Sequence, residues 1–398
     1  MEKSLAMLDD RSRTMRWPAF AVALLSVLAV AAQPRAETID TPAKHALLID
    51  HASGMILLDK ESDVPMPPAS MSKLMTVYMV FRALKEGHLK LDDVMHVSEK
   101  AWKMGGSKMF VEVGSEISVH DLLLGVIVQS GNDACVVLAE GMAGSEEAFA
   151  ERMNAEAKSI GLQNSNFVNA SGWPDPNHLM SARDLVRLAE HLITEFPNYY
   201  EMFAIKEFTY NKIRQGNRNP LLYKNVGADG LKTGHTEGSG YGLVASAVSD
   251  GRRLTLVLNG LESVNQRSRE STRLLNWGFR NFGNYQLFKA GETVTGGLTW
   301  LGDEETVPLV LERPLTVTLA RVARKEMKVS VVYDGPIPTP IQKGAEVARL
   351  RVEAPDTPTI ERPLVAGADV GRLGLAGRLW SALMQLLLGS AAPAPGAT

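Results

Sequence analysis

The chain has 398 residues, which exceeds one ordinary domain and suggests two or three. It carries 42 basic and 45 acidic residues, a formal net charge of −3, and 45% of its residues are hydrophobic, as is typical of a globular protein. Because no strong basic field is present, the composition argues against a nucleic-acid partner.

The N-terminal segment has the pattern of an export signal. Polar residues 1–16 precede an apolar run from Ala19 to Ala32, which is too short to span a bilayer comfortably. We therefore predict a secretory signal peptide over residues 1–36, cleaved near Ala32 or Ala36. Cys135 is the single cysteine, so no intramolecular disulfide can form, and a small buried side chain is its simplest interpretation.

The first chemically informative stretch follows two predicted short strands, 46–50 and 55–58, joined by turn residues 51–54. Pro67 and Pro68 then precede an apolar run, which predicts a helix start. On that helix Ser70 and Lys73 share a face. A lysine with a lowered pKa can take the proton of a serine hydroxyl, so Ser70 is a candidate nucleophile and Lys73 its base. The alternative is a helix cap with a solvated charge.

Two further stretches follow in order. Ser130-Gly131-Asn132 comes after a helical pattern over 119–128, on a predicted turn between helices. Lys232-Thr233-Gly234 precedes an apolar strand pattern over 243–248, with another at 254–259. Ser-x-x-Lys, Ser-x-Asn and Lys-Thr-Gly together are specific, and the first and last are known signatures of β-lactamases and penicillin-binding proteins.

Between these motifs the chain has mostly scaffold patterns. Helices are predicted over 146–160 and 181–196, and Ser181 and Asp184 have the residue types of a capping box. Residues 161–179 predict a loop that crosses one side of the site. Early strands, central helices and later strands indicate an α+β fold, in which an antiparallel sheet is flanked by helices.

The C-terminal third differs from the rest of the chain in its predicted secondary structure. Residues 284–369 predict a small all-β domain, with strands at 307–311, 315–319, 328–333 and 346–352. Residues 370–398 predict an amphipathic helix, beginning at Val370, and a tail. We expect this helix to be an interfacial membrane anchor; packing against the β domain is the alternative.

On these motifs the chain resembles the low-molecular-mass penicillin-binding proteins, the serine D-alanyl-D-alanine carboxypeptidases, from about Thr41 to its C-terminus. The resemblance implies a β-lactamase/transpeptidase-like domain over 37–283. It also implies that Ser70 forms an acyl-enzyme with Lys73 as base, that Ser130 relays a proton to the leaving D-alanine, and that Asn132 binds the substrate backbone. Lys232 would keep Lys73 neutral and polarise Ser130.

The remaining roles concern substrate binding. The oxyanion would lie between the backbone N–H groups of Ser70 and His235. A terminal carboxylate needs a cation or hydroxyl, for which Thr233, Arg218 and Arg267 are candidates, although either arginine could be an ordinary surface charge. Asp184 is a candidate to orient His235.

The sequence lacks the motifs that three competing chemistries would require. A class A β-lactamase would carry Glu-x-x-Leu-Asn between the second and third motifs, and no such string occurs there. Residues 227–233 fail the Walker spacing, and no His-Glu-x-x-His motif is present. We therefore expect neither a cofactor nor a metal.

The expected function is removal of the terminal D-alanine from peptidoglycan stem peptides, with acylation by β-lactam antibiotics. A D,D-endopeptidase that cleaves cross-bridges, or a slow-turnover wall-binding scaffold, remain open alternatives. The expected location is the periplasm, with the C-terminal helix attached to the membrane surface at the outer face of the inner membrane.

Overall fold

The computed structural model describes residues 39–377 and 379, and an antiparallel sheet forms the centre of its larger part. The strand order is β2-β1-β9-β8-β7, and every neighbouring pair is antiparallel. The predicted hairpin over 46–58 and the strands at 243–248 and 254–259 are confirmed. The five strands are β1 (His45–Asp50), β2 (Ile56–Lys60), β7 (Ala228–Thr236), β8 (Gly240–Ser249) and β9 (Arg252–Leu261).

The central strands are buried on both faces and alternate between two cores. In β8, Leu243 and Ala245 belong to one cluster and Val244 to the other. In β9, Leu256 and Val257 divide in the same way. Side chains of a strand point alternately to opposite faces, so the sheet separates the two clusters.

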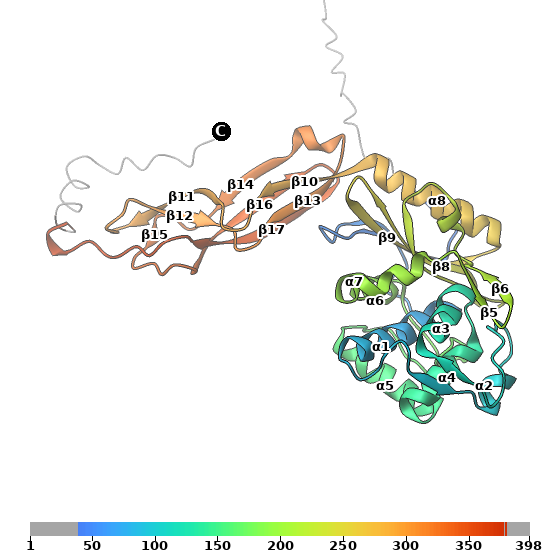
Figure 1. The fold of residues 1–398 in the computed structure, drawn as a ribbon. Coiled ribbons are helices and arrows are strands. Elements are labelled where there is room, and N and C mark those ends of the chain that lie inside the picture. Colours follow the sequence, from blue (N-terminus) through green and yellow to red (C-terminus); the bar gives the residue numbers. More distant parts are fainter. Residues whose placement is uncertain (1–38, 378, 380–398) are drawn as a thin grey trace, which may run out of the picture. The chain divides into compact units, whose positions relative to one another are not determined.

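Helices cover both faces (Figure 1). α8 (Val264–Asn281) packs on β8 and β9 with the cluster that holds Leu274 and Leu275, whereas α1 (Lys73–Lys85) and α6 (Ala182–Glu195) contribute to the other cluster. Sequence reasoning did not identify α8. A signal was present, because Ser263 precedes Gln266 by three residues, and the Ser263 hydroxyl accepts the Gln266 N–H at 3.1 Å.

A group of shorter elements builds the region around the second motif. The helical prediction over 119–128 is confirmed, although its second half is a π-turn, and the predicted helix 146–160 is confirmed as α5. The elements are β3 (Val94–His96), α2 (Glu99–Lys103), β4 (Glu116–Ser118), α3 (Val119–Leu124), η2 (Gly125–Gln129), α4 (Asn132–Ala143), α5 (Glu146–Ser159), α7 (Pro197–Tyr200), η3 (Glu201–Ala204), β5 (Glu207–Tyr210), β6 (Ile213–Gly216) and η4 (Pro220–Tyr223).

The C-terminal part is all-β, as predicted, with its own core that includes Val317, Leu319 and Leu350. Its sheets have the orders β10-β13 and β14-β16-β17-β12-β11-β15. The elements are β10 (Phe282–Phe288), β11 (Thr293–Trp300), β12 (Thr306–Val310), β13 (Leu315–Ala320), η5 (Ala323–Glu326), β14 (Lys328–Val332), β15 (Ile337–Pro338), β16 (Glu346–Ala354) and β17 (Thr357–Ala366).

The structure tests the predictions for the two ends of the chain, the signal peptide and the membrane anchor, only in part. The signal-peptide prediction, 1–36, and most of the predicted C-terminal helix, 380–398, lie outside the described residues. The predicted helix start at Val370 is wrong, because Val370 forms a β-bridge with Ile341 and Arg372 forms one with Gly302. Across residues 39–377 and 379, no helix combines the length and apolar character needed to cross a membrane.

Candidate active site

The turn that carries Ser70 is a short 3₁₀ helix, η1 (Ala69–Ser72), which continues into α1 at Lys73. The sequence predicted Ser70 in the first turn of one helix; the structure instead places it in the tighter turn before α1. Ala69 has a φ of +48°, a left-handed conformation that is costly for a residue with a Cβ. The turn therefore presents Ser70 from a constrained backbone.

Lys73 is completely buried and contacts three oxygen atoms. Its Nζ lies 2.7 Å from Ser70 Oγ, 2.7 Å from Asn132 Oδ1 and 2.5 Å from the carbonyl oxygen of Ser171. Burial, with a smaller contribution from the positive charge of Arg218, lowers the pKa of Lys73 to about 8. A neutral amine has two N–H groups for Asn132 and Ser171, which leaves its lone pair for the Ser70 hydroxyl.

The second motif, Ser130-Gly131-Asn132, lies where the π-turn η2 ends and the helix α4 begins. Ser130 follows the π-turn in a left-handed conformation (φ 64°, ψ 34°) and is almost fully buried. Asn132 begins α4 and donates from Nδ2 to the Gly105 carbonyl at 2.9 Å. The carboxylate of the next residue, Asp133, accepts the backbone N–H groups of residues 109–111, and so fixes the facing loop.

The third motif lies within β7, a strand that sequence reasoning did not predict. Lys232 is buried and makes one hydrogen bond in the described part of the chain, 3.1 Å to the Thr233 carbonyl oxygen. Burial and the positive charges of Lys73 and Arg218 hold the pKa of Lys232 well below its usual value. A Cβ on Gly234 would lie 2.8 Å from the Pro68 carbonyl oxygen, so the glycine lets β7 approach η1 closely.

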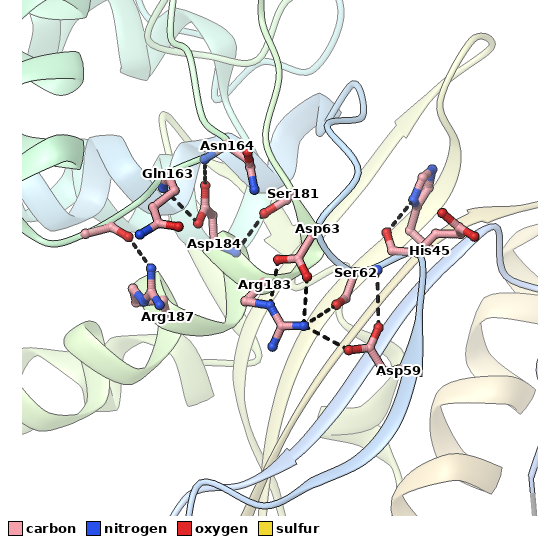
Figure 2. Close-up of polar contacts among 12 residues, drawn as sticks. His45, Asp59, Ser62, Asp63, Gln163, Asn164, Ser181, Arg183, Asp184 and Arg187 are labelled. Atoms are coloured by element: carbon pink, nitrogen blue, oxygen red, sulfur yellow. Dashed lines mark hydrogen bonds and ion pairs between the residues drawn. The ribbon is translucent and has the colours of Figure 1, made fainter.

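His235 is exposed and stacks on Tyr241, with ring centroids 3.9 Å apart. The expectation that Asp184 orients His235 is wrong. Asp184 lies at the start of α6, where its carboxylate accepts the N–H groups of Gln163 and Asn164 at 3.1 and 2.7 Å (Figure 2). Its own N–H donates to Ser181 Oγ at 3.1 Å, so Ser181 caps α6, but the predicted capping box is only half formed because the Asp184 carboxylate binds residues 163–165.

The two candidate arginines differ in burial. Arg267, on α8, is 5% exposed; its Nη1 lies 3.4 Å from the Gly242 carbonyl oxygen, and its Nε has no partner in the described chain. Burial lowers the pKa of Arg267 to about 10. Arg218 is exposed. Within residues 39–377 and 379, neither arginine takes part in an ion pair, so both guanidinium groups can bind an anion.

One cavity of about 900 Å³ brings most of the predicted site together. Lys73 and Lys232 are not part of its lining, but Lys73 contacts Ser70 and Asn132, which are. Sequence reasoning missed several lining residues, although Trp173 and Pro174 belong to the loop it placed beside the site. The predicted residues in the lining are Ser70, Ser130, Asn132, Arg218, Thr233, His235 and Arg267; those missed include Gly106, Ser107, Thr236, Glu237 and Tyr241.

Other reactive groups are few in the described part of the chain. No three His, Cys, Asp or Glu side chains come together there as metal ligands would. Cys135 is buried in α4, and burial raises the pKa of its thiol to about 12, which disfavours the nucleophilic thiolate. Ser70 is therefore the better placed nucleophile of the two.

An antiparallel sheet between helices, with this three-motif cavity, defines the penicillin-binding protein class, and sequence comparison identifies the family within it. The D-alanyl-D-alanine carboxypeptidase family matches residues 30–262, more than half of the chain. A second family, the penicillin-binding protein 5 C-terminal domain, matches residues 282–372. The chain belongs to the D-alanyl-D-alanine carboxypeptidase family.

Individual relatives agree with this family assignment. The chain is 38% identical to D-alanyl-D-alanine carboxypeptidase DacC of Escherichia coli, over 94% of this chain and 96% of that one. Penicillin binding protein 5 from Haemophilus influenzae is 36% identical with a TM-score of 0.77, over 84% and 99% of the two chains. A D-alanyl-D-alanine endopeptidase of Escherichia coli is 30% identical but covers only 65% of this chain and 82% of its own.

Proposed function

We propose that this protein removes the terminal D-alanine from peptidoglycan pentapeptides through an acyl-enzyme on Ser70. The observation that carries the proposal is the set of contacts made by Lys73 Nζ. This atom lies 2.7 Å from Ser70 Oγ, and its other two hydrogen-bond partners are Asn132 Oδ1 and the Ser171 carbonyl oxygen. This arrangement supports a neutral amine that can remove the serine proton.

The reaction proceeds in two halves. Lys73 takes the Ser70 proton as Oγ bonds to the penultimate D-alanine carbonyl carbon. The peptide C–N bond then breaks, and Ser130 relays the proton held by Lys73 to the departing nitrogen, which restores the neutral amine. Water next adds to the ester, releases the shortened peptide and restores the Ser70 hydroxyl. The backbone N–H groups of Ser70 and His235 stabilise the oxyanion in both halves. A β-lactam acylates Ser70 by the same first half.

Recognition of a free C-terminus falls to the cationic end of the cavity. Arg267 and Arg218 both line the cavity without carboxylate partners in the described chain, and Thr233 adds a hydroxyl to the same lining. A carboxylate that accepts from these groups makes charge-assisted hydrogen bonds. Asn132, in the same lining, binds the substrate backbone, and the buried Lys232 adds positive potential.

The carboxypeptidase function is favoured over the D,D-endopeptidase function because the carboxypeptidase relative aligns with a larger share of this chain. The carboxypeptidase relative extends over nearly the whole sequence, including the all-β domain, whereas the endopeptidase relative covers 65% of it. A purely scaffolding role would not require the buried Lys73 arrangement.

Export and attachment belong to the same proposal. The apolar run of residues 19–32 supports secretion to the periplasm, and the amphipathic pattern near the C-terminus supports peripheral binding to the outer face of the inner membrane. The mature enzyme would there meet stem peptides that end in D-Ala-D-Ala.

The test is mass-resolved product analysis with a pentapeptide ending in D-Ala-D-Ala and a cross-linked stem-peptide dimer in one reaction. We expect release of one alanine and an intact dimer. Cleavage of the dimer would favour the endopeptidase, and a stable penicillin adduct without turnover would favour the scaffold. Ser70→Ala should abolish both turnover and penicillin labelling while thermal unfolding stays unchanged; activity in that variant would overturn the proposal.

A further inference from the structure

The active-site cavity contains an aromatic side chain that has no role in the proposed reaction, Tyr241. This residue lies near the start of β8, directly opposite His235 of β7 in the antiparallel ladder. Its half-buried ring lines the cavity together with His235 and Arg267. Tyr241 therefore adjoins both a residue proposed to stabilise the oxyanion and a residue proposed to bind the substrate carboxylate.

The ring of Tyr241 is fixed by its neighbours on the sheet. The imidazole of His235 stacks on it, with ring centroids 3.9 Å apart and ring planes inclined by 27°. Residues directly opposite each other in an antiparallel pair project from the same face of the sheet, so each ring restricts the other. Tyr241 also packs against the hydrophobic cluster that includes Leu243 and the α8 residue Leu274. The ring thus offers a rigid surface to α8.

Arg267, on α8, places its guanidinium group over that surface. Its Cζ lies 5.8 Å from the centroid of the Tyr241 ring, within the range of a cation–π interaction. Within residues 39–377 and 379, the side chain makes one long polar contact, 3.4 Å from Nη1 to the Gly242 carbonyl oxygen, and Nε has no partner. The ring of Tyr241 therefore stabilises a buried cation that no carboxylate of the described chain neutralises.

An aromatic ring and a carboxylate hold a guanidinium group with different consequences. A carboxylate would occupy N–H donors in the guanidinium plane and would neutralise the charge. The π face of a ring attracts the cation and leaves those donors available. Arg267 is thereby kept charged and oriented, with N–H groups free for a bidentate contact to the terminal carboxylate of a substrate.

We propose that Tyr241 is a positioning residue for recognition of the substrate carboxylate, and that its ring acts by holding the guanidinium group of Arg267. This inference rests on the proposed function, in which Arg267 binds the terminal carboxylate. It assigns the effect to the aromatic ring, so phenylalanine should replace tyrosine at this position.

The test uses a pentapeptide with a free C-terminal carboxylate and the same peptide amidated at its C-terminus. For Tyr241→Leu we expect kcat/KM for the free peptide to fall about 5- to 30-fold, through KM more than kcat, and the value for the amidated peptide to change less than about twofold. Tyr241→Phe should stay within about twofold of wild type on both peptides. Tyr285→Leu is the matched control, because it removes the ring 4.4 Å from the Arg324 guanidinium in the all-β domain.

A double-mutant cycle shows whether Tyr241 acts through Arg267. In an Arg267→Gln background the cation is gone, so Tyr241→Leu should cost no more than about twofold further. An additional loss as large as that in the wild-type background would overturn the inference, since the ring would then act elsewhere. Tyr241→Met, a longer non-aromatic side chain, should behave like Tyr241→Leu and replaces it if thermal unfolding shows that leucine disrupts the fold.

Binding of the two peptides to S70A, measured by calorimetry, separates this inference from the proposed function because it needs no turnover. S70A should bind the free peptide more tightly than the amidated one, and this preference should shrink about 5- to 30-fold in S70A/Y241L, even if the wild type releases no alanine. If the wild type releases alanine but Tyr241→Leu affects the two peptides equally, or affects neither, the positioning role is overturned and the carboxypeptidase stands.

Discussion

At the scale of single residues, the chemistry depends on cations that the fold removes from water. Lys73 and Lys232 are both buried, and in the described chain neither takes part in an ion pair. Desolvation disfavours their charged forms, and the positive charge of Lys73 further opposes that of Lys232. Asn132 and the Ser171 carbonyl then give the Lys73 amine a fixed orientation toward Ser70.

This environment predicts a pH dependence of acylation. The base must be neutral, and the pKa of Lys73 is about 8, so the neutral fraction grows as pH rises toward 8 and levels off above it. We expect the second-order rate of penicillin acylation to rise about tenfold per pH unit below about pH 7.5 and to level off above about pH 8.5. A stopped-flow or labelling series from about pH 5.5 to about pH 9.5 measures it. A flat profile would contradict a titrating Lys73 base.

Arg267 has the geometry of an anion site, so its loss should be specific for the substrate carboxylate. Arg267→Gln should lower kcat/KM for a pentapeptide about 10²-fold, through KM more than kcat, because a charge-assisted hydrogen bond is lost. For the same peptide amidated at its C-terminus, the variant should differ little from wild type. Arg280→Gln, at an exposed position on the same helix, is the control. Equal losses on both peptides would point to a structural defect instead.

At the scale of elements, the site is assembled by three backbones that approach closely. β7 reaches η1 because Gly234 has no side chain, and the loop around Gly172 reaches the same turn. Gly172 has a φ of +74°, and a Cβ there would lie 2.0 Å from the Ala69 carbonyl oxygen. The loop that supplies the Ser171 carbonyl to Lys73 is thus fixed against the nucleophile turn.

Gly172→Ala should therefore damage both stability and chemistry. We expect a loss of about 1–3 kcal/mol in the free energy of unfolding and at least about a tenfold loss in penicillin acylation, since the Ser171 carbonyl must move. Gly54→Ala is the matched control, because its φ is +72° but nothing lies within 4 Å of the added Cβ. Denaturant unfolding and labelling kinetics measure both. Equal effects in the two variants would show that backbone strain alone, and not the clash, is responsible.

At the scale of the whole molecule, the sheet with its helices holds the chemistry, and the all-β domain has a core of its own. Residues 370–372 complete that domain, since Val370 pairs with Ile341 and Arg372 donates to the Thr339 carbonyl oxygen at 2.5 Å. The proposed membrane anchor therefore begins after these residues.

Removal of residues 380–398 tests the proposed anchor without disturbing the all-β domain. The truncated protein should leave the membrane fraction on sedimentation and keep its rate of penicillin labelling, because the apolar residues proposed to bind the interface are lost while the site is intact. The full chain is the control. A truncated protein that still sediments with membranes would place the attachment elsewhere.

Sequence patterns alone identified the family, the α+β class, the all-β C-terminal domain and the residues of three motifs. These features depend on hydrophobic periodicity and on short motifs, both of which involve residues close together in the sequence. Among the elements they missed are α8 and β7. The helical pattern of α8 was overlooked despite the Ser263 signal, and Lys-Thr-Gly was taken as the approach to a strand when it lies within one.

Only the tertiary structure decided how the motifs meet. The Ser171 carbonyl on Lys73 and the engagement of Asp184 by residues 163–165 join residues distant in the chain or depend on backbone atoms. Such contacts have no local signature, since they arise from close packing of segments whose spacing in sequence carries no information about their distance in space. Residue types therefore predicted the chemistry, and packing determined its geometry.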